Sequence, residues 1–346
     1  MLQPAEQTGA GAQVLPVTGS GEAFLRLSGR NEEIMEQITV YSTMSEYRDD
    51  FRIRGYVFGE GEKSLCVVGS MRGNEMQQMF TCSQLVRRLK ELEAKEKLVP
   101  GKKILVMPCC NPYSVNVRKK FWTIDNTDIN RMFPGYSEGE ATQRIAAGIF
   151  EEAKDYPYGI QFTSFYIRGR FAPHVRMMHT GLEDVELAKE FGLPYIMIRK
   201  PRPFDTTTLN YNWQIWETDA FSLYTTNTES VDREGALQAV NAVLRFMVRR
   251  GLLKPEAAPP DEWTEPRIVS DTHLVNVRNT APGFFDGHVL PGYPVSEGEE
   301  MAQVLDPYDG SVRCRITAPC RGRVLFMHSG DMCYVNEAVY KIIRDE

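Results

Sequence analysis

The sequence predicts an α/β fold in which helices cover both faces of a mixed, mostly parallel sheet, followed by a small all-β module. From residue 34 to 251, short apolar runs alternate with longer amphipathic ones, a pattern typical of strands separated by helices. A Pro-rich stretch at 252–264 predicts a linker. At 265–346, short β-like runs are separated by Gly, Pro and Asp turns about every eight to twelve residues, which indicates an all-β module.

The strands and helices of the α/β region follow from the spacing of their apolar residues. Short apolar or alternating runs predict strands at 38–41, 52–58, 65–68, 103–107, 160–167, 194–198 and 221–225. Apolar residues at helical spacing predict helices at 76–97, 138–155, 183–191 and 233–250. Pro100 and Gly101 end the first of these helices. Strands joined by helices of this length run mainly parallel, so both faces of the sheet are expected to be covered.

The C-terminal module is expected to contain six short strands. They are predicted at 269–277, 283–290, 301–305, 311–318, 322–327 and 338–343. Turns at 294–298, 316–322 and 335–339 are similar to those of biotinyl and lipoyl barrel-sandwich modules. The module has no Ala-Met-Lys-Met attachment hairpin, so a prosthetic arm is not expected.

Composition and charge predict a protein that acts free of membranes and nucleic acids. Hydrophobic residues make up 42% of the 346 residues and charged residues 25%, as in ordinary globular proteins. The net charge of −6 comes without a basic block for nucleic acid, and no stretch reaches the ~20 apolar residues of a membrane helix. Seven cysteines, an odd number, are expected to be free thiols, which predicts a cytoplasmic location. Residues 1–33 are expected to form a flexible leader.

Two segments carry most of the chemical information. Residues 69–75, Gly-Ser-Met-Arg-Gly-Asn-Glu, form a small-residue turn between a predicted strand and a predicted helix. Residues 111–135 begin with Asn-Pro-Tyr-Ser-Val and end with Asp-Ile-Asn-Arg-Met-Phe-Pro-Gly. These segments resemble the His-Gly-Asn/Asp-Glu and the Asn-Pro … Asp-Leu-Asn-Arg-x-Phe-Pro-Gly signatures of the succinylglutamate desuccinylase/aspartoacylase family, relatives of zinc carboxypeptidases. The resemblance extends over about residues 35–346 and includes a C-terminal barrel.

The resemblance implies a zinc carboxypeptidase-like fold and the hydrolysis of amides of N-acyl amino acids. In such an enzyme zinc polarises the amide carbonyl and activates water, a glutamate transfers protons, and an arginine anchors a carboxylate. The His and Glu of the first signature are zinc ligands. Here Glu75 is present, but Arg72 takes the place of the histidine. An arginine side chain has no lone pair to give to a metal ion.

Two further positions of the family's site are also exchanged. The strand that carries the third zinc ligand corresponds to 160–164, which puts Thr163 in the place of a histidine. A threonine hydroxyl is a poor zinc ligand. The strand that carries the catalytic glutamate corresponds to 221–225, which puts Thr225 in its place. Zinc is the cofactor that the resemblance implies, although Arg72 and Thr163 cannot serve well as ligands, and Glu75 remains the one catalytic candidate.

The resemblance also indicates a cationic pocket for a small carboxylate such as an N-acyl amino acid. Arg131 falls at a substrate-binding position, and a guanidinium fork matches a carboxylate in geometry and charge. Polar-aromatic segments at 164–170 and 199–213 are expected to contribute to the walls of this pocket. The predicted ligand-binding residues are Arg72, Asn130, Arg131, Thr163, His174, Arg176 and Thr225.

Three functional hypotheses stay open. The favoured one is a catalytically impaired family member, a pseudoenzyme, that kept the fold and binds a small anionic ligand. The alternative is an active zinc-dependent amidohydrolase whose metal is held by Glu75 with His174 or His179. The third is a scaffold that uses the β module for assembly. Metal-independent chemistry by Glu75 as a lone general base and assembly into a homo-oligomer also stay open.

Overall fold

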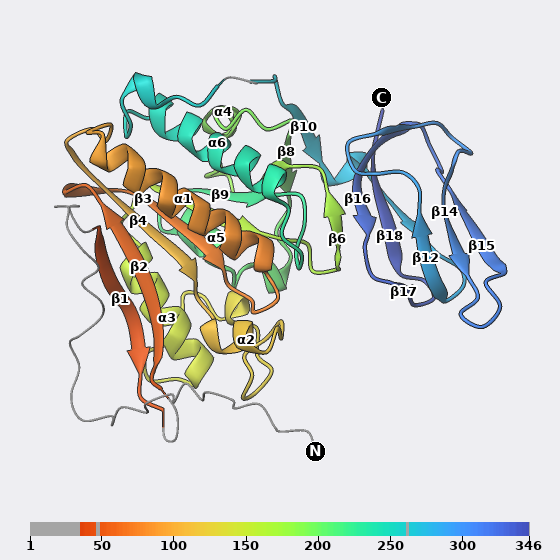
Figure 1. The fold of residues 1–346 in the computed structure, drawn as a ribbon, viewed down its shortest axis with the longest axis horizontal. Coiled ribbons are helices and arrows are strands. Elements are labelled where there is room, and N and C mark those ends of the chain that lie inside the picture. Colours follow the sequence, from red (N-terminus) through yellow and green to blue (C-terminus); the bar gives the residue numbers. More distant parts are fainter. Residues whose placement is uncertain (1–34, 46–48, 261–262, 346) are drawn as a thin grey trace, which may run out of the picture. The chain divides into compact units, whose positions relative to one another are not determined.

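Nine strands of the α/β region form one sheet, in the order β1-β2-β4-β3-β5-β9-β7-β8-β10 (Figure 1). The computed structural model describes residues 35–45, 49–260 and 263–345, so the predicted leader at 1–33 and residues 261–262 of the predicted linker lie outside the described residues. The strands are β1 (Glu36–Thr43), β2 (Phe51–Phe58), β3 (Gly61–Ser70), β4 (Gly101–Cys109), β5 (Tyr158–Thr163), β7 (His174–Met178), β8 (Tyr195–Arg199), β9 (Asp219–Tyr224) and β10 (Arg267–Ser270). The β3–β4, β3–β5, β5–β9, β7–β8 and β8–β10 pairings are parallel and the other three are antiparallel. The predicted mixed, mostly parallel sheet is confirmed.

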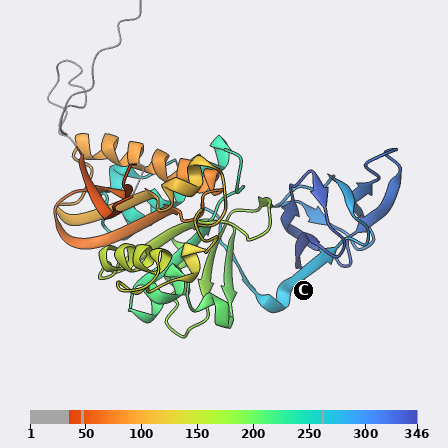
Figure 2. The same cartoon turned by 90° about the horizontal axis from the view of Figure 1, so that it is seen from below.

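Helices cover both faces of this sheet because its central strands are apolar on both sides. In β3, Leu65 and Val67 point to one face and Cys66 and Val68 to the other. Helices α1 and α6 pack on the first face and α3 and α5 on the second, as Figure 2 shows. The helices are α1 (Met76–Ala94), α2 (Pro112–Asn116), α3 (Ala141–Ala153), α4 (Val185–Lys189), α5 (Leu209–Ile215) and α6 (Arg233–Arg249).

Several elements differ from the prediction. Strand β7 and helices α2 and α5 have no counterpart among the predicted strands and helices, and the strand predicted at 160–167 ends at Thr163. Helix α5 is held by tertiary contacts rather than by helix-forming residues. Its Trp213 is fully buried and donates its indole N–H to the Ala153 carbonyl at 3.1 Å. Propensity within the segment is therefore a poor guide to this helix.

The C-terminal module consists of two antiparallel sheets around a core of its own. Strands β11-β18-β16-β13 form one sheet and β15-β14-β12-β17 form the other. The bounds are β11 (Leu274–Arg278), β12 (Gly283–Gly287), β13 (Pro294–Val295), β14 (Glu300–Leu305), β15 (Val312–Thr317), β16 (Gly322–His328), β17 (Met332–Cys333) and β18 (Ala338–Arg344). The core between the sheets includes Met301, Val304 and Tyr340. The predicted all-β module is confirmed.

The module and the large sheet share parts of the chain. The strand predicted at 269–277 is two strands, because β10 pairs with β8 in the large sheet and only β11 belongs to the module. A short 3-10 helix, Asp271–His273, separates them. In the other direction, β6 (Gly169–Phe171) leaves the α/β region and pairs with β16 of the module. These cross-pairings position module residues beside the end of the large sheet.

All seven cysteines lie in the described residues and are free, as their odd number predicts. Burial raises the pKa of the Cys66, Cys82 and Cys110 thiols, so they act as packing groups rather than nucleophiles. Within residues 35–45, 49–260 and 263–345, no helix is both long and apolar enough to cross a membrane.

Candidate ligand-binding site

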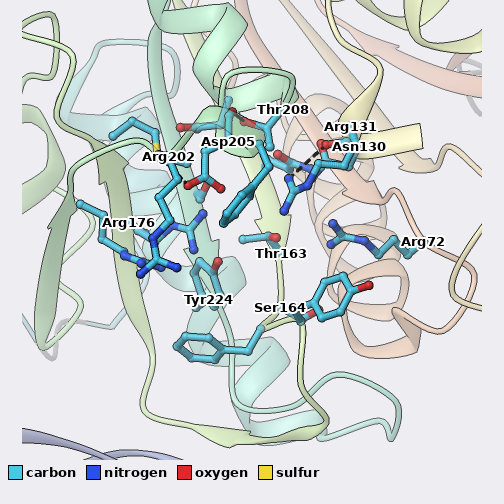
Figure 3. Close-up of a pocket in the computed structure, with 18 of the residues that line it drawn as sticks. Arg72, Asn130, Arg131, Thr163, Ser164, Arg176, Arg202, Asp205, Thr208 and Tyr224 are labelled. Carbon is cyan, nitrogen blue, oxygen red and sulfur yellow. Dashed lines mark hydrogen bonds between the residues drawn. The ribbon is translucent and has the colours of Figure 1, made fainter. Parts of the chain in front are cut away.

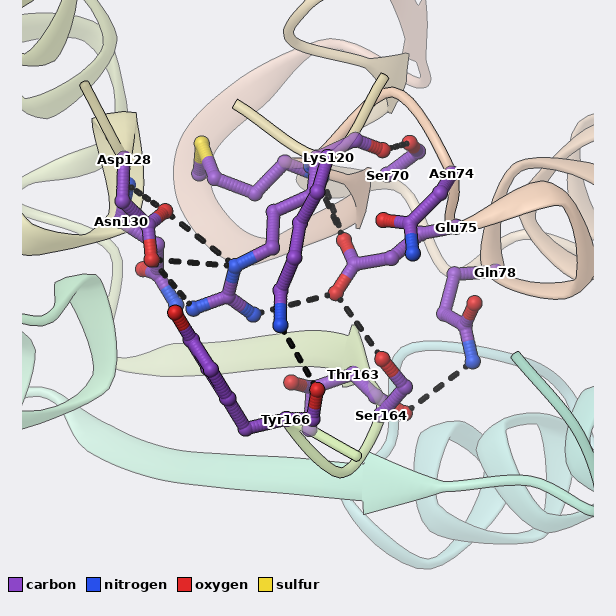
Figure 4. A network of polar contacts seen from close by, with 12 residues as sticks. Ser70, Asn74, Glu75, Gln78, Lys120, Asp128, Asn130, Thr163, Ser164 and Tyr166 are labelled. Carbon is purple, nitrogen blue, oxygen red and sulfur yellow. Dashed lines mark hydrogen bonds and ion pairs between the residues drawn. The ribbon is translucent and has the colours of Figure 1, made fainter. Parts of the chain in front are cut away.

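The turn at 69–75 joins the carboxyl end of β3 to the start of α1 and is fixed by its own hydrogen bonds. Glu75 Oε2 accepts backbone N–H bonds from Met71 and Arg72, both at 3.0 Å. The Ser70 hydroxyl donates to the Arg72 carbonyl at 2.6 Å. Glu75, labelled in Figure 4, also forms an ion pair with the Arg72 side chain at 3.2 Å.

Arg72 is buried, 5% exposed, between two carboxylates. Its Nε donates to both oxygens of Asp128 at 3.1 and 3.2 Å, and its Nη2 donates to Asp128 Oδ2 at 2.9 Å. Its Nη1 donates to Glu75 Oε1 at 3.2 Å. Burial alone would lower the pKa of Arg72, but the charges of Glu75 and Asp128 outweigh it and raise the pKa above its ordinary value. Arg72 is therefore a fixed positive charge.

Zinc does not fit this arrangement. Each Glu75 oxygen already accepts two bonds, Oε2 from the two backbone N–H groups and Oε1 from Arg72 and the Ser164 hydroxyl, the latter at 3.1 Å. A carboxylate accepts about four hydrogen bonds, so Glu75 has no lone pair left for a metal. Arg72 has none to offer, and a hydroxyl such as that of Thr163 is a poor ligand. In the described part of the chain, no three His, Cys, Asp or Glu side chains are placed to hold a metal ion.

Lys120 adds a second cation beside this network (Figure 4). Its Nζ donates to the Tyr166 carbonyl at 2.7 Å and lies 3.0 Å from the centre of the Tyr166 ring. Burial, reinforced by the charge of Arg72, lowers the pKa of Lys120 to about 8. Lys120 is mostly protonated at neutral pH, but it loses its proton at a lower pH than an exposed lysine does.

A cavity of about 200 Å³ lies at the carboxyl ends of β5 and β9 (Figure 3). Gln161 and Thr163 reach it from β5, and Ser222 and Tyr224 reach it from β9. Six basic side chains line it, against one described carboxylate, that of Asp205. The six are Arg72, Arg131, Arg176, Arg199, Arg202 and Lys341. This excess of positive charge favours an anionic ligand.

Three of these arginines have no ion-pair partner among the described residues. Arg131 and Arg202 lie over the ring of Phe204, with Cζ at 5.6 and 5.9 Å from its centre. Arg176 lies over the ring of Tyr224, with Cζ at 5.2 Å. A cation–π contact orients a guanidinium without neutralising its charge. In Figure 3, Arg131 and the pair Arg176 and Arg202 enter the cavity from opposite sides, so a ligand between them can meet both.

Asn210 contributes an uncharged polar group at the start of α5. It lines the cavity, is 3% exposed, and neither its Nδ2 nor its Oδ1 has a hydrogen-bond partner in the described part of the chain. Buried amides are nearly always hydrogen-bonded in proteins. The two atoms together suit a ligand group that both accepts and donates, as an amide does.

The structure places Tyr224, rather than Thr225, in the cavity wall. Thr225 lies one residue beyond β9, and it is Tyr224 that stands opposite Thr163 in the β5–β9 register and lines the cavity. Thr225, which takes the place of the family's catalytic glutamate, is therefore outside the cavity lining. The reason is the alternation of side chains along β9, which turns Ser222 and Tyr224 toward the cavity.

Neither histidine of the rearranged metal set forms a hydrogen bond with Glu75. His174 is fully buried and stacks on Tyr224, with ring centres 4.4 Å apart. Its Nδ1 donates to the Ala172 carbonyl at 2.8 Å, which leaves Nε2 without a partner among the described residues. His179 is exposed and pairs with Glu183. None of the four bonds to the Glu75 carboxylate comes from a histidine.

His174 makes stability depend on pH in a way that can be measured. Burial lowers its pKa to about 3, helped by the charge of Arg176 and opposed by the bond to Ala172, against an ordinary value of 6.5. As the pH falls below 6.5, the unfolded chain binds a proton that the folded chain excludes, so stability falls by up to about 1.4 kcal/mol per pH unit until about pH 3. We expect His174→Phe to reduce the slope of unfolding free energy between about pH 6 and pH 4 by this amount in urea denaturation. His288→Phe, which removes an exposed histidine of the module, is the control; equal slopes in both variants would contradict the assignment.

The cavity brings together most, but not all, of the predicted ligand-binding residues. Those that line it are Arg72, Asn130, Arg131, Thr163 and Arg176. His174 lies behind Tyr224, and Thr225 lies outside. Asp205, Asn210 and Arg202 come from the polar-aromatic segment 199–213, whose composition was the signal for a pocket wall. Lys341 has no such signal, because its place depends on strand pairing within the module.

Comparison with known proteins gives consistent matches. Residues 62–247, just over half of the chain, match the family model described as succinylglutamate desuccinylase/aspartoacylase catalytic domain. A curated relative, the N-alpha-acetyl-L-2,4-diaminobutyric acid deacetylase of Halomonas elongata, is 23% identical over 282 residues, 72% of this chain and 72% of that protein. The solved succinylglutamate desuccinylase/aspartoacylase of Rhodobacter sphaeroides has a TM-score of 0.72 at 17% identity, covering 92% of this chain and 99% of that one. The product-bound ectoine utilization protein EutE (DoeB) of Ruegeria pomeroyi has a TM-score of 0.71 at 17% identity, covering 90% and 94%.

Proposed function

This chain belongs to the succinylglutamate desuccinylase/aspartoacylase family, and we propose that it binds a small carboxylate ligand, such as an N-acyl amino acid, without a metal ion. The observation that carries the proposal is the buried Arg72 in the place of a zinc-binding histidine. A fixed guanidinium offers a ligand oxygen the positive charge that a metal ion would supply. On this proposal the protein is catalytically impaired.

Arg72 keeps part of its hydrogen-bonding capacity for a ligand. A guanidinium has five N–H donors, and three are used on Asp128 and Glu75, one each from Nε, Nη2 and Nη1. One N–H on Nη1 and one on Nη2 remain, and Arg72 lines the cavity. Two donors on neighbouring nitrogens suit a carbonyl or carboxylate oxygen.

Arg131 is the proposed anchor for the ligand carboxylate. It lies next to Asn130, whose Oδ1 accepts the backbone N–H of Leu209 at 3.3 Å and so ties this segment to the start of α5. Burial and, after it, the charge of Arg72 lower the pKa of Arg131 from its ordinary value, while Asp128 and Asp205 oppose them. A ligand carboxylate would offset the cost of burying this charge.

The alternative is an active zinc-dependent amidohydrolase in which Glu75 and His174 or His179 hold the metal. The relationship to a deacetylase favours it, because that relative acts on an N-acetylated amino acid according to its name. The bonding of Glu75 and the positions of the two histidines support the metal-free proposal instead. Metal analysis separates the two: stoichiometric zinc in protein purified without chelator, lost in Glu75→Ala, would favour the amidohydrolase.

The anion-binding proposal is tested by calorimetry with N-acetylglycine as the probe. We expect Arg131→Met to weaken binding by about 30-fold or more, because removing one partner of a buried charge contact costs about 2–5 kcal/mol. Arg144→Met, which removes an exposed arginine from α3, is the matched control and should leave the affinity unchanged. Binding that survives Arg131→Met, or no binding by the wild type, would contradict the proposal.

A further inference from the structure

The two sheets of the C-terminal module differ in what covers their outer faces. In the sheet β11-β18-β16-β13, Leu325 and Ile343 point away from the module core and are buried against Tyr195 of the α/β region. The α/β region therefore covers that face. In the sheet β15-β14-β12-β17 (Figure 1), by contrast, the outward-pointing Phe284 and Met332 are 44% and 49% exposed. Among the described residues, this second outer face is open to solvent.

An apolar row crosses this open face, with one residue from each strand. Strand pairing places side by side Val312 of β15, Leu305 of β14, Phe284 of β12 and Met332 of β17. Residues that lie opposite each other across antiparallel strands point to the same side of a sheet. In β14 and β17 the adjacent Val304 and Cys333 enter the module core, so alternation turns the row outwards. A solvent-exposed sheet face normally carries polar side chains, and an apolar patch in their place marks a contact surface.

The size of this apolar patch matches what one partner contributes to a stable interface. Tyr334, two residues after Met332, lies at the end of the row and is 82% exposed. With about 150–200 Å² for a complete side chain, roughly 400 Å² is exposed by Tyr334, Phe284, Met332 and Val312. A standard protein interface takes about 800 Å² from each partner, and a little over half of that area is apolar. The row and Tyr334 therefore supply the apolar part of such an interface.

The charges on the four strands compensate each other. Every charged side chain of β12, β14 and β15 has a partner, and the pairs are Arg313 with Asp306, Arg315 with Glu300, and Asp286 with His288. The face therefore has no strong charge of one sign that would select nucleic acid, an anionic membrane or a charged peptide. The same face of a second copy fits it, because two-fold symmetry brings identical patches together and neutral pairs do not repel each other. Two sheets pack face to face in this way in β-sandwiches.

We propose that the outer face of the sheet β15-β14-β12-β17 binds the same face of a second copy of this chain, so that the protein is a two-fold symmetric dimer. The contact is made by the apolar row and by Tyr334 at its end. None of these residues lines the ligand cavity, so the inference is independent of the proposed function. The C-terminal module then acts in assembly, and each chain keeps a complete set of cavity-lining residues.

Sedimentation velocity of the full chain tests this surface. At concentrations of about 100 μM, we expect the wild type to have the mass of two chains. Phe284→Glu should weaken dimerisation about 30-fold or more, because it buries a carboxylate within the apolar contact. Tyr334→Glu should act in the same direction, and its exposed position keeps the substitution away from the module core. Circular dichroism shows whether Phe284→Glu is folded; where it is not, Tyr334→Glu decides.

Leu237→Glu is the matched control, because Leu237 is 60% exposed on α6, outside the module, and its replacement should leave the dimer intact. The inference is overturned if the full chain keeps the mass of one chain up to about 100 μM, which would leave residues 1–33 or another protein as the cover of this face. It is equally overturned if the dimer survives both Phe284→Glu and Tyr334→Glu, because the contact would then lie on another surface.

Discussion

Replacing Arg72 with methionine is expected to lower the free energy of unfolding by about 3–5 kcal/mol, because it leaves buried carboxylates without their cation. Arg72 and Glu75 are 5% and 1% exposed, and Arg72 contacts Asp128 through three hydrogen bonds. Water replaces such bonds only in part where carboxylates are buried. Urea unfolding midpoints of the wild type and Arg72→Met measure the loss.

The same substitution at an exposed ion pair provides the control. Arg52 pairs with Asp50 at 3.3 Å, but its side chain is 59% exposed, so Arg52→Met should cost no more than about 1 kcal/mol. Adding Asp128→Asn to Arg72→Met should recover part of the loss, because it removes one of the unpaired charges. Equal costs for Arg72→Met and Arg52→Met would show that the buried network contributes nothing beyond a surface pair.

The double variant Arg72→His/Thr163→His is expected to bind about one zinc ion per chain, and the wild type is expected to bind none. The change supplies two imidazoles and also frees the lone pair of Glu75 Oε1 that Arg72 occupies. Both positions line the same cavity, and Ser164, next to Thr163, already touches Glu75 at 3.1 Å. Asp128, released from Arg72, is placed to accept the second N–H of the new imidazole at position 72.

Zinc content after dialysis into metal-free buffer measures this gain. Each single variant should retain far less zinc than the double variant, because two protein ligands hold the ion less well than three. Adding Glu75→Gln to the double variant should remove the metal, since the amide is a weaker ligand than a carboxylate. Zinc in the wild type at the level of the double variant would contradict the proposal that Arg72 takes the place of the metal ion.

The parts of the fold that were predicted correctly are those whose signal is local. Helices α1 and α6 repeat apolar residues at helical spacing, and β3 is a continuous apolar run. Helix α5 and strand β7 have no such pattern and depend on distant contacts. Trp213 of α5 donates to the Ala153 carbonyl, and β7 pairs with β8 and β9. Strand β10 could not be assigned to the large sheet, since nothing in its four residues encodes a parallel pairing with β8.

In the candidate site, too, the residues with a local signal could be predicted and the others could not. The predictable ones lie in or beside short motifs, so a resemblance is enough to identify Arg72, Glu75, Thr163 and Arg131. Tyr224 depends on the register of β9, and a motif without fixed ends leaves that register open by one residue. The neighbours of Lys341 in the cavity are set by the pairing of β18 with β11 and β16 and of β16 with β6. Such long-range pairings are not written in any one segment.

Because Lys341 lies in β18, one wall of the ligand cavity is complete only when this strand is in place. During synthesis the α/β region emerges first, with Arg72, Arg131 and Arg176 already in the chain, but the wall that contains Phe326 and Lys341 is still missing. Strand β18 pairs with both β11 and β16, so the module sheet closes only after residues 338–344 have left the ribosome. A chain that stops before β18 therefore lacks the wall that contains Lys341, so any stabilisation that depends on contacts with this wall needs the complete module.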